Sequence, residues 1–151
     1  MQAKPTITQI FKAKRKGFIY YLLVAALIPL GIYTFGSNRL NENSYTLIPI
    51  LIPFLLLLWA YLTTRYQIKN KELHYRSAFL FGKLDIESIN SITVGKTLWS
   101  GTKPALARKG LIIKYNRYDE IYIAPQRNNE MIAAILKLNP TIEVIYADKA
   151  G

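Results

Sequence analysis

The chain has 151 residues with a formal net charge of +11 and no cysteine. The lack of cysteine excludes disulfides, zinc–thiolate sites and thiol nucleophiles. The charge is uneven, because residues 1–17 hold five basic and no acidic side chains, whereas residues 63–151 hold 14 basic and 8 acidic ones. Attraction to an anionic membrane surface explains much of this pattern. No nucleic-acid recognition motif accompanies the charge, so we expect no nucleic-acid partner.

Two uncharged apolar segments, Phe18–Phe35 and Tyr45–Leu62, dominate the amino-terminal part of the chain. Each has 18 residues, and a helix of that length reaches about 27 Å, close to the ~30 Å hydrocarbon core of a bilayer. The segments therefore predict a helical hairpin that crosses a membrane twice. Pro29, Pro49 and Pro53 predict kinks, since neighbouring groups can satisfy the freed carbonyls.

Basic and aromatic side chains flank both segments and predict an orientation. Lys and Arg near span ends stay on the cytoplasmic side, so we expect a multi-pass protein of a bacterial inner membrane with both termini in the cytosol. Rings with a polar tip favour the headgroup region. The expected interfacial anchors are Lys14, Arg15, Lys16, Tyr20, Trp59, Tyr61 and Arg65.

Two alternatives to membrane spans carry less weight. A cleaved signal peptide needs a small-residue cleavage site, and none follows Phe35. A soluble protein that buries both helices needs a larger core than the remaining 89 residues supply. The predicted organisation is a basic cytosolic tail at 1–17, a transmembrane hairpin at 18–62 with spans 18–35 and 45–62, and a cytosolic domain at 63–151.

From residue 65 onward the chain changes to short alternating segments that predict antiparallel strands. Asn70-Lys71 suits a two-residue hairpin turn, because Asn accepts a positive φ, and a second turn is expected at Gly82-Lys83. The stretch Gly95–Lys109, rich in Gly, Pro and cations, predicts a long loop. The predicted strands are Tyr66–Lys69, Glu72–Ser77 continuing through Ala78–Phe81, Leu84–Ile86, Ile89–Val94, Gly110–Tyr115 and Glu120–Ala124.

The last element has a helical period. Pro125 suits a first helical turn, and Asn139-Pro140 ends the pattern. Thr141–Tyr146 predicts a short extended tail. Apolar residues recur at spacings of three and four, at Met131, Ile132, Ile135, Leu136 and Leu138. A small open sheet leaves an apolar face that one helix can cover, so the fold class is α+β.

The run Gly110–Val144 resembles the carboxy-terminal signature of bacterial pleckstrin-homology-like domains of the YyaB-like type. It holds a strand, a turn with Tyr and Asp, a strand ending in a small residue and Pro, and a helix closing at Asn-Pro. Tyr66–Ala107 is similar in layout. The resemblance implies a partly open barrel of antiparallel strands closed by the helix and attached to a bacterial inner membrane. One departure is Ala124, where a hydroxyl residue often caps the helix.

Three groups of residues invite comparison with known chemistry. Gly95-Lys96-Thr97 lacks the earlier glycine of a phosphate-binding loop, since position 90 is Asn. His74 is the single histidine and has no nucleophile motif beside it. Asp85 and Glu87 form too small a set for a metal site. We therefore expect no enzyme, no catalytic or metal-ligating residue and no cofactor.

The long loop mixes cations with a large aromatic side chain, at Lys96, Trp99, Lys103, Arg108 and Lys109. Such a loop could contact anionic headgroups or an acidic partner, although its Trp could also pack on the domain while its cations face water. The leading hypothesis is a membrane-anchored, non-enzymatic binding or assembly module whose partner is another protein or a second copy. The alternative is an accessory subunit whose transmembrane hairpin packs into a larger membrane complex.

Overall fold

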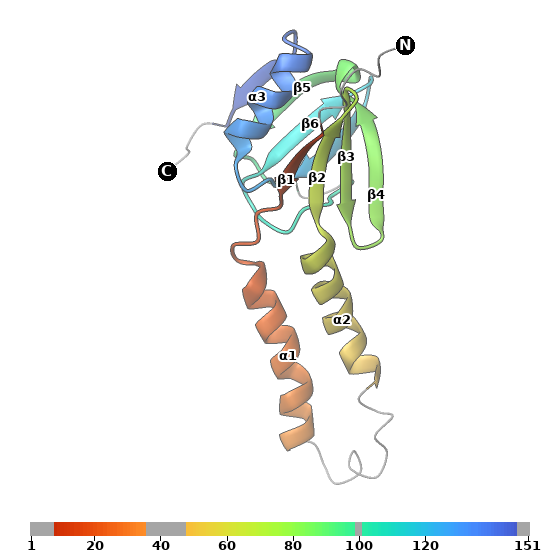
Figure 1. The fold of residues 1–151 in the computed structure, drawn as a ribbon. Coiled ribbons are helices and arrows are strands. Elements are labelled where there is room, and N and C mark those ends of the chain that lie inside the picture. The colour runs from red at the N-terminus through yellow and green to blue at the C-terminus, as the bar shows by residue number, and fades with distance from the viewer. Residues whose placement is uncertain (1–7, 36–47, 99–100, 148–151) are drawn as a thin grey trace, which may run out of the picture.

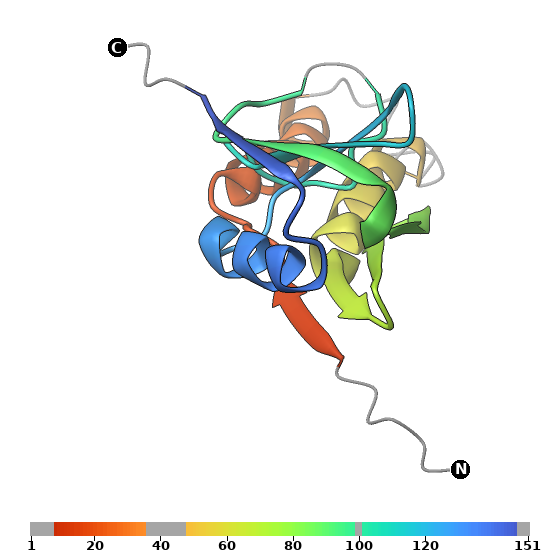
Figure 2. The same ribbon diagram turned by 90° about the horizontal axis from the view of Figure 1, so that it is seen from above.

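The computed structural model describes residues 8–35, 48–98 and 101–147. Two four-stranded sheets and one short helix form a domain from which two longer helices extend at one end (Figure 1). Figure 2 views the domain from the opposite end, with those two helices nearly end on behind the sheets. The described elements confirm the α+β class.

The first sheet has the strand order β1-β2-β3-β4, with every neighbouring pair antiparallel. Its strands are β1 (Gln9–Lys12), β2 (Arg65–Lys69), β3 (Glu72–Ser77) and β4 (Leu80–Asp85). The predicted turn at Asn70-Lys71 is confirmed, and both residues have positive φ, 50° and 64°. Strand β1 was not predicted, because only its pairing with β2 reveals it.

The predicted turn at Gly82-Lys83 is wrong, since both residues lie inside β4. The chain reverses earlier, at Ala78, which has a φ of 48° and donates its N–H to the Thr63 hydroxyl at 2.9 Å. Gly82 serves packing instead, because a Cβ there would lie 2.5 Å from the hydroxyl oxygen of Tyr75.

The second sheet has the order β7-β6-β5-β8 and is antiparallel except for the parallel pair β5–β8. Its strands are β5 (Ile89–Val94), β6 (Leu111–Tyr115), β7 (Asp119–Ile123) and β8 (Glu143–Tyr146). A short 3-10 turn, η3 (Ile86–Ser88), leads from the first sheet to the second. The predicted tail is thus a strand of this sheet.

Helix α3 (Asn128–Leu138) closes the core, with Met131, Ile132 and Ile135 buried. The prediction that Pro125 starts the helix is wrong, because Pro125 bridges to Ala13 of the amino-terminal segment. Ala124 is not a helix cap either. It is fully buried, and its carbonyl accepts the N–H of Lys14 at 2.7 Å.

Helices α1 (Phe18–Phe35) and α2 (Ile48–Thr63) lie side by side (Figure 1). The rings of Phe18 and Tyr61 stack with centroids 6.1 Å apart. Both helices contain a proline, Pro29 in α1 and Pro53 in α2.

The two predicted membrane spans are not supported. Helix α2 has 16 residues, two fewer than predicted, which corresponds to about 24 Å against a ~30 Å bilayer core. Within the described ranges, no helix combines the length and apolarity needed to cross a membrane. The predicted localisation, a multi-pass inner-membrane protein with two cytosolic termini, is therefore contradicted. The predicted division at residue 63 stays a prediction, to which β1 adds a strand from the amino-terminal segment.

Candidate functional site

Two buried tyrosines hold the long loop against the sheets. The Tyr66 hydroxyl donates to the Pro104 carbonyl at 2.7 Å and accepts the N–H of Ala124 at 3.1 Å. The Tyr122 hydroxyl donates to the Ala107 carbonyl at 2.8 Å and accepts the N–H of Gly110 at 2.9 Å. Both rings have no exposed surface. These bonds fix the second half of the loop at the end of the domain where the helices emerge.

Burial also keeps one of these hydroxyls protonated. Loss of hydration around Tyr66 raises the pKa of its phenol above the ordinary value near 10, because the charged form is disfavoured in an apolar environment. The hydroxyl therefore remains a donor to the loop in alkaline solution, where an exposed tyrosine with the ordinary pKa near 10 loses its proton.

A groove of about 1030 Å³ lies between this loop and α1. Its floor is mostly apolar and comes from one side of α1, from Leu57 of α2 and from Leu106 of the loop. Its cationic side chains are Lys14, Lys16, Lys103, Arg108 and Lys109, and no Asp or Glu is among the residues that line it. We call this feature the cationic groove.

The structure brings together three of the five predicted loop residues. Lys103, Arg108 and Lys109 line the cationic groove. Lys96 is exposed and lies outside the groove lining, and Trp99 lies outside the described residues. The Lys103 ammonium also lies 5.6 Å from the centroid of the Tyr122 ring, within the range of a cation–π contact.

The sequence did not assign Lys14 and Lys16 to this site. They were predicted as interfacial anchors, but they line the cationic groove opposite the loop. The segment reaches the site because Lys14 is hydrogen bonded to Ala124, and Gln126 donates its N–H to the Lys12 carbonyl at 2.8 Å. Their clustered charge was visible in the sequence, whereas this long-range pairing was not.

Two of the other predicted anchors, Arg15 and Arg65, line a neighbouring groove together with Lys14 and Lys16. Arg15 lies over the Tyr61 ring, 4.7 Å from its centroid, and donates to the Leu62 carbonyl at 3.5 Å. Tyr20 and Trp59 are 69% and 44% exposed. Arg65 is exposed at the start of β2.

Comparison with known proteins identifies the family of this domain. The model of the family "Bacterial PH domain" matches residues 64–139. The chain belongs to this bacterial PH domain family. It is 26% identical over 136 residues to the "Uncharacterized protein YyaB" of Bacillus subtilis (strain 168), and the match covers 87% of this chain and 89% of that protein. No solved structure matches.

The PH-domain match runs from the end of α2 through β2 to the end of α3. It therefore includes the three loop cations of the cationic groove but neither Lys14 and Lys16 nor α1. The family thus supports a binding domain, and the groove is completed by parts of the chain outside the matched range.

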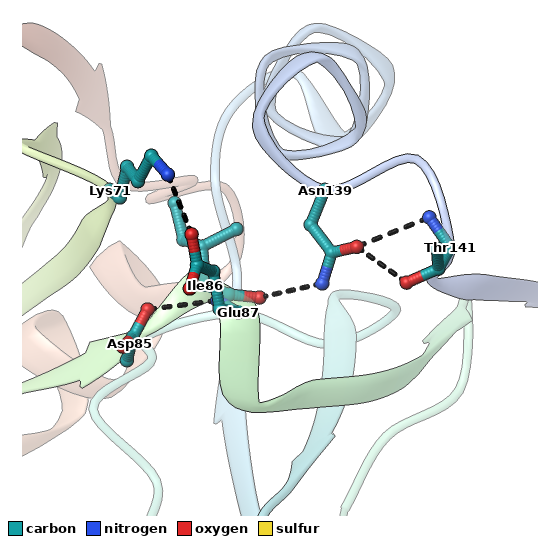
Figure 3. A network of polar contacts seen from close by, with 6 residues as sticks. All are labelled: Lys71, Asp85, Ile86, Glu87, Asn139 and Thr141. Atoms are coloured by element: carbon teal, nitrogen blue, oxygen red, sulfur yellow. Dashed lines mark hydrogen bonds and ion pairs between the residues drawn. The ribbon is translucent and has the colours of Figure 1, made fainter.

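The titratable groups with candidate chemistry are engaged in local contacts. Glu87 pairs with Lys71 at 2.6 Å, and Asp85 accepts the N–H of Glu87 at 2.9 Å, which caps η3 (Figure 3). His74 lies 3.1 Å from Glu72. In the described part of the chain, no group of three or more His, Cys, Asp or Glu could hold a metal ion. Asp85 and Glu87 have structural roles at the link between the two sheets.

Figure 3 also shows how the end of α3 is attached to this link. The Asn139 side chain donates to the Ile86 carbonyl at 3.1 Å and accepts the Thr141 hydroxyl at 2.6 Å. The predicted helix end at Asn139 is confirmed, since this residue is the C-cap. One amide side chain thus joins α3, η3 and the segment that precedes β8.

Proposed function

We propose that this protein is a non-enzymatic PH-like binding module whose cationic groove receives an acidic, amphipathic segment of a partner protein. The observation that carries the proposal is the groove lining, which has five cations, no carboxylate and an apolar floor. Unlike charges across an interface steer association and select partners. An apolar floor contributes binding energy that charge alone does not.

The shape of the floor supports a helical partner. Phe18, Tyr21, Ala25 and Ile28 line the groove and follow one another at spacings of three, four and three along α1. Residues with this spacing form a single face of a helix, against which a second helix packs. Recognition of an amphipathic helix by a groove uses the same spacing on the partner.

A synthetic probe tests this proposal. The probe is a fluorescent helical peptide with Leu at i, i+3, i+4 and i+7 and with Glu beside that face, and its binding is measured by fluorescence anisotropy. We expect a Lys16→Glu/Arg108→Glu variant to bind at least about tenfold more weakly than the wild type, because each change turns an attraction into a repulsion.

The matched control is Arg117→Glu/Lys137→Glu, which changes the net charge equally at two exposed positions outside the groove. It should bind the probe like the wild type. If both variants bound the probe equally weakly, the effect would come from net charge alone, and the cationic groove would not be the binding site. Binding to vesicles of anionic lipid, without binding to the peptide, would refute the protein partner.

A second candidate function, assembly of copies through α1 and α2, is favoured by a separate observation. The two helices carry no ionisable side chain except tyrosines and expose many large apolar ones. Among these are Leu23, Val24, Leu27, Ile28, Leu30, Leu51, Ile52, Leu55 and Leu56, each at least 42% exposed. Two antiparallel helical pairs can bury such surfaces as a four-helix bundle.

Native mass spectrometry separates this second function from the first. We expect a dimer in the wild type and a monomer in a Leu27→Glu/Leu55→Glu variant, since the two leucines are 61% and 57% exposed. A monomeric wild type would rule out assembly of copies. It would leave the peptide experiment unaffected.

A further inference from the structure

The outward face of the first sheet carries a row of cations at the end near the helices. Lys12 of β1 pairs in register with Arg65 of β2, and Arg65 pairs with Arg76 of β3. Residues directly opposite each other in a sheet project from the same face, so the three cations are neighbours. All three are exposed.

Like charges directly opposite each other destabilise a sheet. In the part of the chain that the structure describes, none of the ion pairs joins Lys12, Arg65 or Arg76 to a carboxylate. The nearest acid on strand β3 is Glu72, four residues from Arg76, which corresponds to about 13 Å along a strand. Glu72 is already engaged with Lys83 at 2.6 Å and with His74. The repulsion within the row is therefore not relieved by the described acids.

The row also borders an aromatic side chain. Phe81 of β4 pairs in register with Arg76 and is 75% exposed. Arg65, Arg76 and Phe81 line a shallow groove of about 520 Å³ together with Gln67, His74, Tyr75, Gly82 and Lys83. No acidic residue is part of that lining. This groove shares no lining residue with the cationic groove.

We propose that this face is a second binding site, which takes a phosphate monoester through Arg65 and Arg76 and rests the group that carries the phosphate on Phe81. A guanidinium fork binds two oxygens of one anion at a time. A phosphate monoester carries a charge of about −1.5 to −2 and three acceptor oxygens, so it can be shared by two neighbouring arginines. A carboxylate has one charge and satisfies one fork. The exposed ring supplies an apolar contact beside the anion.

The full chain is titrated with phenyl phosphate, and binding is followed by isothermal titration calorimetry. We expect binding that is about tenfold weaker for an Arg65→Gln/Arg76→Gln variant and several-fold weaker for Phe81→Ala. Benzoate should bind more weakly than phenyl phosphate. The matched control is Lys69→Gln/Arg117→Gln, which removes the same charge from exposed positions outside the groove and should bind like the wild type.

A wild-type measurement covers the case in which the arginine variant does not fold. In NMR spectra, the side-chain Nε–H signals of Arg65 and Arg76 should shift on addition of phenyl phosphate, whereas that of Arg117 should not. Equal shifts of all three, or equal affinity of the two double variants, would overturn the proposal.

An experiment with lipid vesicles distinguishes a lipid headgroup from a free ester as the source of the phosphate monoester. Phosphatidate has a monoester headgroup, whereas phosphatidylglycerol has a diester. Retention on phosphatidate vesicles alone would support a lipid source, and binding of phenyl phosphate without retention would support a free ester. Failure of both probes would refute this site. The peptide experiment on the cationic groove would still stand.

Discussion

The two ends of the domain differ in whether their charged side chains are paired with opposite charges. At the end with the β2–β3 turn and η3, the carboxylates of Glu87 and Glu72 pair with Lys71 and Lys83, and Glu72 also lies 3.1 Å from His74. At the end where α1 and α2 emerge (Figure 1), no acid lines the cationic groove, and no described ion pair joins Lys12, Arg65 or Arg76 to a carboxylate. Charge at the first end joins structural elements, whereas Lys12, Arg65 and Arg76 at the second end are exposed and lie outside the described ion pairs.

The two ends also differ in which side chains form hydrogen bonds to the backbone. At the turn end, polar side chains such as Asn139 tie one element to the next. At the helix end, buried tyrosine hydroxyls do this, and the cations remain on the surface. We infer that stability at the helix end comes from buried groups, so its surface charge can serve binding.

The largest expected effect on the helix end comes from Gly110→Ala. A Cβ at Gly110 would overlap the carbonyl oxygen of Ile123 and lie 3.1 Å from Cα of Ala124. Overpacking against backbone cannot be relieved by a rotamer change, so we expect a loss of about 3 kcal/mol in the free energy of unfolding. Urea denaturation measures it.

The control for this change is Gly31→Ala in α1, where a Cβ would meet nothing within 4 Å. Ala favours a helix over Gly by about 1 kcal/mol, so this variant should be unchanged or more stable. A Gly110→Ala protein as stable as the wild type would show that the loop anchor is less tightly packed than these distances indicate.

The next effect comes from Tyr66→Phe. The change leaves the Pro104 carbonyl and the Ala124 N–H without their partner, and a buried unsatisfied polar group costs about 1–3 kcal/mol. We expect a loss of about 2 kcal/mol at neutral pH, measured by urea denaturation. Tyr20→Phe, at an exposed position of α1, is the matched control and should be neutral.

Tyr66→Phe also has a pH signature. Because the pKa of Tyr66 is raised in the folded state, its contribution to stability is complete below the unfolded pKa of about 10 and is lost as the pH rises above that value. The variant should therefore lose less stability than the wild type between neutral and strongly alkaline pH. An identical alkaline decline in both proteins would contradict the burial of this hydroxyl.

Much of the fold could be predicted from local sequence signals. The bounds of β5 and α1 agree with the alternation and apolarity of their residues. Strand β3 begins at Glu72 as predicted, but it ends at Ser77, so the predicted continuation through Ala78–Phe81 is wrong. The Asn70-Lys71 turn follows from the tolerance of Asn for positive φ. Errors arose where a residue serves packing instead of chain reversal, as Gly82 does beside the Tyr75 ring.

The candidate sites depend on contacts that no local pattern contains. Lys14 and Lys16 reach the loop because the segment before α1 pairs with β2 and with residues 124–126. The Arg65–Arg76 pair follows from the register of the β2–β3 hairpin, which the predicted turn already implied. The arginine pair could therefore be found from the sequence, whereas the cationic groove could not.

A smaller effect on stability is expected from a substitution in the Lys12–Arg65–Arg76 row. Arg76→Glu places a carboxylate opposite Arg65, so a like-charge pair becomes an opposite-charge pair. We expect stabilisation of about 0.5 kcal/mol at low salt, which decreases in high salt because the side chains are exposed. Urea denaturation at both salt concentrations measures it.

Arg117→Glu is the control for this charge reversal, since Arg117 lies in the β6–β7 turn, away from the row. Its effect should be near zero. Destabilisation by Arg76→Glu at low salt would mean that the row is not under repulsion, and the argument for a bound anion would lose its basis.

The smallest effect is expected at the turn end, from Glu72→Gln. Hydrogen bonding to Lys83 lowers the pKa of Glu72. A carboxyl group with a lowered folded pKa contributes stability above its unfolded pKa of about 4.3, and this contribution is lost as the pH falls through the folded value. Thermal melting between about pH 7 and pH 3 should therefore show a less steep decline in the variant than in the wild type.

The matched control for Glu72→Gln is Glu143→Gln in β8, an exposed carboxylate outside the described ion pairs. It should retain the wild-type decline. Because Lys83 is exposed and Glu72 is partly exposed, moderate salt should reduce the difference between Glu72→Gln and the wild type. If the difference between Glu72→Gln and the wild type persisted in high salt, the Glu72–Lys83 pair would be shielded from solvent. The turn end would then depend on buried charge, unlike the helix end.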